Sequence, residues 1–303
     1  MVDLCGLELA HPIINGSGTY DAIAARRAFG DALLDRFPFS AFVSKTITLN
    51  PRDGNPPPRL YETPAGMINS IGLPNKGLDG YLAHDLPELA RLPVPLITNV
   101  MGSTADEFAA LVEAVAARAE IDAIELNVSC PNVKTGLDIG ADPRELEAVV
   151  ARVRPLSAKP LIVKLTPNAS DVPAAAAAAE AAGADAVSLI NTLRAYAPHP
   201  RGVGALGSSP WLGGGTGGLS GPAIRAVALA QVRAVAMRVA IPIVGMGGVQ
   251  TGRHAGQLLE AGATAVAVGT ESFRDPAAGT RIQRELYDFF AKSGDIADTA
   301  SGV

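Results

Sequence analysis

The stretch PIVGMGGVQTGRHAGQLLEAGATAVAVGT, residues 242–270, contains two short apolar runs with a helix-like segment between them. The first run, Pro242–Gly248, ends in two glycines, and the second, Ala265–Thr270, ends in glycine and threonine. The segment between them, Thr251–Ala261, has the length and composition of a helix. Two strands that are apolar along their whole length, joined by a helix, form the repeating unit of parallel sheets covered by helices.

Six further apolar runs of this kind lie upstream: Pro12–Gly18, Ala41–Thr46, Pro95–Val100, Ala123–Val128, Pro160–Leu165 and Ala186–Asn191. Helix-like segments separate most of them: Ala105–Arg118, Pro143–Arg154, Val172–Ala182 and Pro222–Val239. Eight strands that are buried on both faces match a parallel (β/α)8 barrel, whereas an open doubly wound sheet usually has fewer. The sequence therefore predicts an α/β fold of the TIM-barrel type.

The length of 303 residues fits one such barrel, since barrels of this type use about 250 residues or more. No linker rich in Pro, Gly or Ser divides the chain, so we predict a single domain over residues 1–303. Two long stretches, Leu49–Lys76 and Leu193–Gly218, are rich in Pro, Asn or Gly and are expected to be irregular active-site loops.

The amino-acid composition and net charge indicate which classes of protein are expected and which are excluded. Hydrophobic residues make up 48% of the chain and charged residues 18%, which predicts a globular protein with a large core. The N-terminus MVDLCGLELAHP lacks the features of a signal peptide, and no stretch reaches the roughly 20 apolar residues of a membrane span, so a cytoplasmic protein is expected. A net charge of -5 argues against a nucleic-acid partner.

Polar residues gather at the predicted carboxyl ends of the strands, where barrel enzymes place their functional groups. They are Ser17, Lys45, Thr46, Asn99, Asn127, Lys164, Asn191, Thr192, Gly247, Gly248, Gly269 and Thr270. One lysine at a barrel rim could extend to solvent, but two lysines beside three asparagines favour a shared ligand. The glycines after the seventh and eighth strands lie where barrels hold a phosphate through backbone N–H groups.

The segment NVSCPN, residues 127–132, contains one of only two cysteines in the chain. Cys130 has no second cysteine or histidine at metal-ligand spacing, so no metal site is expected, and two distant cysteines do not make a disulfide framework. An isolated cysteine is most often an inert buried residue. Its place on a loop that leaves a barrel strand, between two asparagines and before a proline, favours a chemical role instead.

Several motifs, in this order along nearly the whole chain, resemble the dihydroorotate dehydrogenase family. They are SKT at 44–46, NSIGLPNKG at 69–77, ELNVSCPNVKTG at 125–136, VKL at 163–165, INT at 190–192, GGTGGLSGPAI at 214–224, GMGGV at 245–249 and AVGT at 267–270. NVKTG after the cysteine and the TGGLSGP form are similar to the class 1B, NAD-linked catalytic subunits. Class 2 members have a serine where Cys130 stands.

The resemblance implies an FMN in the barrel mouth and oxidation of dihydroorotate to orotate, the redox step of pyrimidine (UMP) biosynthesis. It implies that Cys130 takes the C5 proton while hydride leaves C6 for the flavin, and that Lys45 acts beside it. The implied substrate-binding residues are Lys45, Asn69, Ser70, Ile71, Gly72, Leu73, Asn127, Asn132, Asn191 and Thr192. The implied FMN-binding residues are Ser17, Lys45, Thr46, Asn99, Asn127, Lys164, Ile190, Gly221, Gly247, Gly248, Gly269 and Thr270.

The final electron acceptor is not expected in this chain. Two cysteines cannot hold an iron–sulfur cluster, which takes four ligands, and no GxGxxG motif opens a βαβ unit that could bind NAD. The resemblance implies a partner subunit with FAD and a [2Fe–2S] cluster, on a homodimeric core, in a heterotetramer. The segment Leu193–Gly215 departs from the usual family sequence, so the partner surface or the acceptor could differ.

Three other functions remain open. A tRNA-dihydrouridine synthase is also an FMN barrel, but it would call for a basic surface. A dihydropyrimidine dehydrogenase-like enzyme acts on the same C5–C6 bond, although its loop usually lacks an asparagine at the place of Asn132. A barrel that binds FMN without catalysis would not need Lys45, Cys130 and Asn191 together. Within the family, a fumarate-type acceptor is the alternative to NAD.

Overall fold

Eight parallel strands form a nearly closed barrel in the computed structural model, which describes residues 1–129, 139–199 and 210–300, the last nine of these without their side chains. The order around the barrel is β3, β14, β13, β10, β9, β8, β7, β4. The strands are β3 (Ile13–Asn15), β4 (Phe42–Val43), β7 (Leu96–Val100), β8 (Ala123–Asn127), β9 (Leu161–Lys164), β10 (Ala186–Leu189), β13 (Ile243–Met246) and β14 (Ala265–Val268). All eight predicted strands and the barrel fold are confirmed.

A single side chain joins the first strand of the barrel to the second. Asn15 on β3 donates from Nδ2 to the carbonyl of Val43 at 2.8 Å, and its Oδ1 accepts from the N–H of Val43 at 2.8 Å. The amide thus repeats the donor–acceptor pair of a backbone ladder at the place where β4 is only two residues long. This pairing closes the ring of strands.

Helices cover the outside of the barrel, as predicted. They are α5 (Ala105–Ala116), α6 (Pro143–Val153), α7 (Val172–Ala181), α8 (Arg225–Ala236) and α9 (Gly252–Glu260), each within a few residues of its expected range. Four begin after side-chain caps: Thr104, Asp142, Asp171 and Thr251 each accept from an N–H in the first turn. The alanine-rich α7 buries Ala175, Ala176 and Ala179, so it is an ordinary packed helix.

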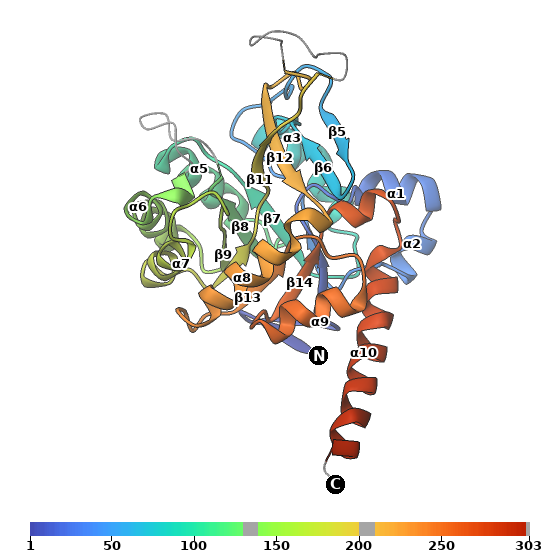
Figure 1. Ribbon diagram of the computed structural model, residues 1–303. Helices are drawn as coiled ribbons and strands as arrows, with labels where there is room; N and C mark the ends of the chain where they lie inside the picture. Colours follow the sequence, from blue (N-terminus) through green and yellow to red (C-terminus); the bar gives the residue numbers. More distant parts are fainter. Residues whose placement is uncertain (130–138, 200–209, 301–303) are drawn as a thin grey trace.

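The prediction of two irregular loops was wrong. The stretches contain β5 (Leu60–Thr63), β6 (Gly66–Asn69), β11 (Leu193–Tyr196) and β12 (Thr216–Ser220), which form one antiparallel sheet in the order β11, β12, β6, β5. Figure 1 shows this sheet at the top of the barrel. One of its two central strands, β12, has glycine at two of its five positions, and a Cβ at Gly217 would lie 2.4 Å from the carbonyl oxygen of Asn69 on β6. Such a strand carries no alternating apolar pattern from which it could be predicted.

Shorter elements complete the fold. They are β1 (Val2–Leu4), β2 (Leu7–Leu9), α1 (Ala22–Phe29), α2 (Ala32–Asp35), α3 (Gly77–Gly80), a π-turn at Tyr81–Asp85, α4 (Leu86–Leu89) and 3-10 turns at Ile139–Ala141, Arg154–Leu156, Pro222–Ile224 and Thr270–Phe273. The last helix, α10 (Ala278–Ala300), packs on α9 and then extends away from the body (Figure 1).

The apolar core has two main parts. One lies between the barrel and its helices. The other fills the barrel interior, where Ile14, Ile97 and Val244 meet Leu4 and Leu9 of the N-terminal β1–β2 hairpin. This hairpin therefore closes the end of the barrel at which the strands begin. In the described part of the chain, no helix is long and apolar enough to cross a membrane.

Candidate functional site

The barrel interior changes from apolar to polar along its strands. On β8 the inward positions run from Ala123 to Glu125 to Asn127, and on β9 they run from Ile162 to Lys164. Glu125 is only 3% exposed and accepts hydrogen bonds from Ser188 Oγ at 2.7 Å and from the amide of Asn99. This buried polar layer separates the apolar core from a cavity at the carboxyl ends of the strands.

The cavity has a volume of about 1250 Å³. It extends from the ends of the barrel strands to the inner side of the antiparallel sheet, from which Met67 and Gly217 reach it. The structure brings most of the predicted site residues together on its wall: Ser17, Lys45, Thr46, Asn69, Ser70, Ile71, Gly72, Leu73, Asn127, Lys164, Ile190, Asn191, Thr192, Gly221, Gly247, Gly248, Gly269 and Thr270.

One predicted residue among those described, Asn99, is not on that wall. Asn99 is fully buried beneath the cavity, where its amide donates to Glu125 and its Oδ1 has no hydrogen-bond partner in the described part of the chain. Cys130 and Asn132 lie outside the described residues, so their roles stay predictions. The neighbouring Ser129 does line the cavity.

Two lysines reach the cavity from opposite parts of the barrel. Lys164 is 5% exposed and donates to Ser17 Oγ at 2.8 Å. Lys45 is exposed to the cavity that it lines, and the partial burial lowers the pKa of its ammonium, against a smaller opposite effect of Asp21. Neither lysine forms an ion pair with a carboxylate in the part of the chain that the structure describes. Both are suited to meet an anion or an electron-rich ligand.

Side-chain amides form a linked group between these lysines and the antiparallel sheet. Asn191 donates from Nδ2 to Ser129 Oγ at 2.8 Å and to Asn127 Oδ1 at 3.4 Å, and its Oδ1 accepts from the N–H of Thr192 at 2.8 Å. Asn69 donates to the carbonyl of Gly218 at 3.2 Å. Amides offer both donors and acceptors, so this wall suits a flat ligand with both kinds of group.

Glycines form the opposite end of the cavity. Gly248 has a φ of +69°, and a Cβ there would lie 2.8 Å from the carbonyl oxygen of Gly221 and 2.9 Å from Cβ of Arg225. Gly247 has a φ of +135°, and its Cβ would lie 2.6 Å from Cβ of Ala228. Only glycine allows the backbone to curve so closely here, and such curved backbone can receive a phosphate.

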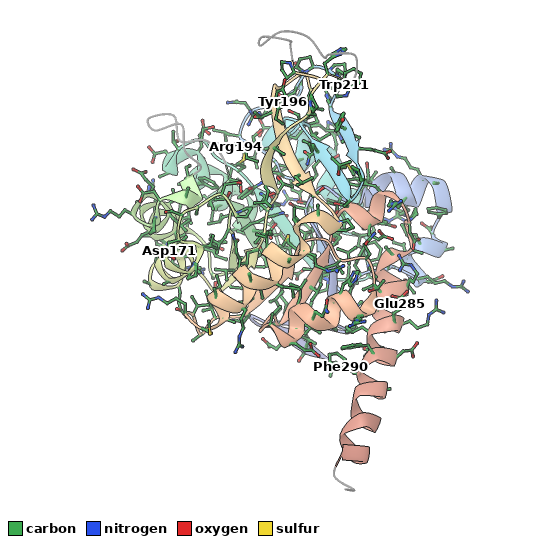
Figure 2. The ribbon with its side chains drawn as sticks, in the orientation of Figure 1. Asp171, Arg194, Tyr196, Trp211, Glu285 and Phe290 are labelled. Atoms are coloured by element: carbon green, nitrogen blue, oxygen red, sulfur yellow. The ribbon has the colours of Figure 1, made fainter. Side chains whose placement is uncertain are left out.

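Arg281 of α10 links the loop that follows β13 to the loop that follows β14. Its guanidinium donates to the carbonyl of Gln250 at 2.9 Å, after β13, and to the carboxylate of Glu271 at 3.0 Å, after β14. Glu285, one turn along α10 (Figure 2), accepts from Arg281 at 3.2 Å and from the N–H of Gly252 at 2.8 Å. The geometry of this end of the cavity thus depends on a helix that does not line it.

Sequence reasoning missed other residues near the cavity because it considered only the ends of the barrel strands and the residues carried over from the family motifs. Arg52 and Asn55 line the cavity from the stretch expected to be irregular, and Asn55 donates to the carbonyl of Ser70 at 3.1 Å. Asn75 supports the adjacent loop without lining the cavity. The NSIGLPNKG motif was the available signal for Asn75. No cluster of three or more potential metal-ligating His, Cys, Asp or Glu residues occurs among the described residues.

Comparisons with known proteins agree with this arrangement. The family model described as "Dihydroorotate dehydrogenase" matches residues 1–290. A protein of Geotalea daltonii named "Dihydroorotate dehydrogenase B (NAD(+)), catalytic subunit" is 42% identical over 294 residues, which cover 97% of this chain and 93% of that protein. A protein of Pelobacter propionicus with the same name is 44% identical over 294 residues, covering 97% and 94%.

Proposed function

This chain belongs to the dihydroorotate dehydrogenase family, and from that premise we propose that it oxidises (S)-dihydroorotate to orotate in pyrimidine biosynthesis. The observation that carries the proposal is the convergence of eighteen predicted site residues, from every part of the family motif set, on one cavity. A glycine cradle at one end, two lysines without a carboxylate partner among the described residues in the middle, and an amide wall at the other end match a flavin with a small polar ring beside it.

The residues present fit FMN. The cradle at Gly221, Gly247 and Gly248 has no room for a Cβ and leaves backbone N–H groups for a phosphate, together with Gly269 and Thr270. Lys164, Thr46 and Asn127 are buried polar groups that would bind the ring system, with Ser17 and Ile190 beside them. Asn99 Oδ1 is a buried acceptor still without a partner in the described residues. FMN, when bound, supplies the acceptor for the hydride that leaves C6 of dihydroorotate.

Neutral groups would orient the substrate. Asn69, Asn127 and Asn191 present amides to the pyrimidine ring, with Thr192 and, as a prediction, Asn132. The backbone at Ser70–Leu73 would receive the carboxylate. Lys45 would place its positive charge where the reaction makes the flavin ring electron-rich.

Cys130 would remove the proton from C5. The wall that Asn127 and Asn191 form has no carboxylate among the described residues. The thiol of Cys130, which follows Ser129 in the sequence, is therefore the available base there. A thiol with an ordinary pKa near 8.5 is partly ionised at mildly alkaline pH, and neighbouring amide donors can stabilise its anion.

Electrons would then pass to NAD through a partner subunit. The relatives' printed names contain both "NAD(+)" and "catalytic subunit", which supports a second subunit for the acceptor chemistry. We place FAD and a [2Fe–2S] cluster on that subunit, with two copies of this chain at the core of a heterotetramer. The predicted single domain and cytoplasmic location stay predictions.

The proposal is tested by anaerobic titration of the FMN-loaded protein with dihydroorotate, followed in the visible flavin band. We expect stoichiometric bleaching by dihydroorotate and none by dihydrouracil. Bleaching by dihydrouracil alone would favour the dihydropyrimidine dehydrogenase-like function. If fumarate reoxidises the bleached protein without any partner subunit, fumarate and not NAD is the acceptor.

A further inference from the structure

Three successive residues that line this site have N–H groups with no acceptor in the described part of the chain. The N–H groups of Ile71, Gly72 and Leu73 form no hydrogen bond to the described part of the chain, and all three residues line the cavity. Gly72 has a φ of +74° and Leu73 a φ of +55°, so two consecutive residues are in the left-handed region. Successive N–H groups in such a turn form a concave site for an anion.

Leu73 is an unusual residue for this conformation. A side chain larger than that of glycine clashes with its own backbone at positive φ, so a leucine persists there only when its surroundings hold it. The support therefore has to come from contacts made by the loop itself or by its neighbours.

Asn75 makes those contacts. Its Nδ2 donates to the carbonyl of Leu73 at 2.8 Å and to Thr48 Oγ1 at 3.0 Å. Its Oδ1 accepts from the N–H of Gly77 at 2.8 Å and from the N–H of Thr48 at 3.2 Å. Its backbone pairs in both directions with Arg52 at 3.0 Å.

The amide of Asn75 is thus bonded on both of its ends, and it lies outside the cavity wall. Because the bonds to Thr48 and Gly77 fix the plane of the amide, its donor is aimed at Leu73. The peptide that joins Leu73 to the next residue is therefore held in one orientation.

We propose that Asn75 is a positioning residue that locks Leu73 in the left-handed conformation and so aims the N–H groups of Ile71, Gly72 and Leu73 at the substrate carboxylate. The inference rests on the proposed function, because that function supplies the carboxylate.

The test compares Asn75→Ala with the wild type, both loaded with FMN, by isothermal titration with orotate. Orotate affinity is expected to fall about tenfold, which corresponds to about 1.4 kcal/mol. The affinity for the uncharged methyl ester of orotate and the affinity of the apoprotein for FMN should each change by less than about twofold. With dihydroorotate as substrate, KM should rise more than kcat falls.

Asp122→Ala is the matched control, since Asp122 also accepts from a backbone N–H, that of Leu96 at 2.8 Å, but at the other end of the barrel. It should leave orotate affinity unchanged. If Asn75→Ala does not fold, Asn75→Ser replaces it, because its hydroxyl is too short to reach Leu73 and should give the same selective loss.

Unchanged orotate affinity in Asn75→Ala would overturn the role of Asn75. Equal losses of affinity for orotate, for its methyl ester and for FMN would also overturn it, because they would indicate a general loss of structure. A wild-type flavin that dihydroorotate does not bleach would instead overturn the proposed function. The two failures are therefore distinguishable.

Discussion

At the scale of single residues, the two cysteines differ in a way that can be measured. Burial, with the carboxylates of Asp185 and Asp3, raises the pKa of the Cys5 thiol to about 12. Between pH 7 and about 9 Cys5 therefore stays protonated and unreactive. If the rate of dihydroorotate oxidation rises with pH between pH 7 and about 9, a group other than Cys5 is therefore responsible.

We expect iodoacetamide at pH 8 to modify Cys130 and to spare Cys5, because only a thiolate reacts quickly. Orotate should slow the modification. Mass spectrometry of the digested protein measures both effects. Rapid labelling of Cys5, or labelling of Cys130 that orotate does not slow, would contradict the assignment.

Cys130→Ala should keep its FMN and lose turnover by about 10²- to 10⁴-fold, the usual contribution of a general base. Stopped-flow measurement of flavin bleaching by dihydroorotate gives the rate, and Cys5→Ala is the matched control with normal turnover. Near-normal bleaching in Cys130→Ala would remove Cys130 from the mechanism.

Lys45→Gln should lower kcat about a hundredfold, since the proposed mechanism uses the charge of Lys45 to stabilise the developing electron density. The apoprotein should nevertheless unfold at a higher temperature than the wild type at neutral pH. Burial lowers the pKa of Lys45, so the native state carries a costly ammonium below that pKa, and the cost is relieved as pH rises through it. The difference in Tm between variant and wild type should therefore shrink at alkaline pH, and a constant difference would contradict this account.

At the scale of elements, the amide of Asn15 is the link between β3 and Val43 of β4. Asn15→Leu removes both hydrogen bonds to Val43 and leaves the N–H and the carbonyl of Val43 buried without those partners. We expect a loss of about 2–4 kcal/mol in the free energy of unfolding, which urea denaturation measures. A loss below about 0.5 kcal/mol would argue against the pairing.

Most barrel strands were predictable from the sequence because they are apolar on both faces and end in a polar residue, as Leu161–Lys164 does. The antiparallel sheet was not, because β12 is formed by the close approach of Gly217 and Gly218 to other strands rather than by a local pattern. The residues on the cavity wall were predictable as family motifs. Asn75 lies inside one of these motifs, but its role was not predictable, because it does not line the cavity and acts through a hydrogen bond to the backbone of Leu73; Arg281 acts through hydrogen bonds to distant segments.

At the scale of the whole molecule, the N-terminal hairpin packs into one end of the barrel and the cavity occupies the other end. Leu4 is fully buried in the barrel interior at the end away from the cavity. Leu4→Ala should cost about 2–5 kcal/mol in unfolding free energy and leave the kcat of the folded protein at 25 °C unchanged. A fall in kcat without a fall in stability would contradict this separation.

The N-terminal hairpin also has a consequence for how the chain is made. Leu4 and Leu9, which are synthesised among the first residues, belong to the same core cluster as Ala265 and Ala267, and β3 pairs Ile13 with Val266 on β14. Contacts so distant in sequence cannot form until nearly all of the chain has left the ribosome. Release from the ribosome therefore precedes closure of the barrel, and a nascent chain stalled before β14 would leave the apolar faces of β1 and β2 available to chaperones.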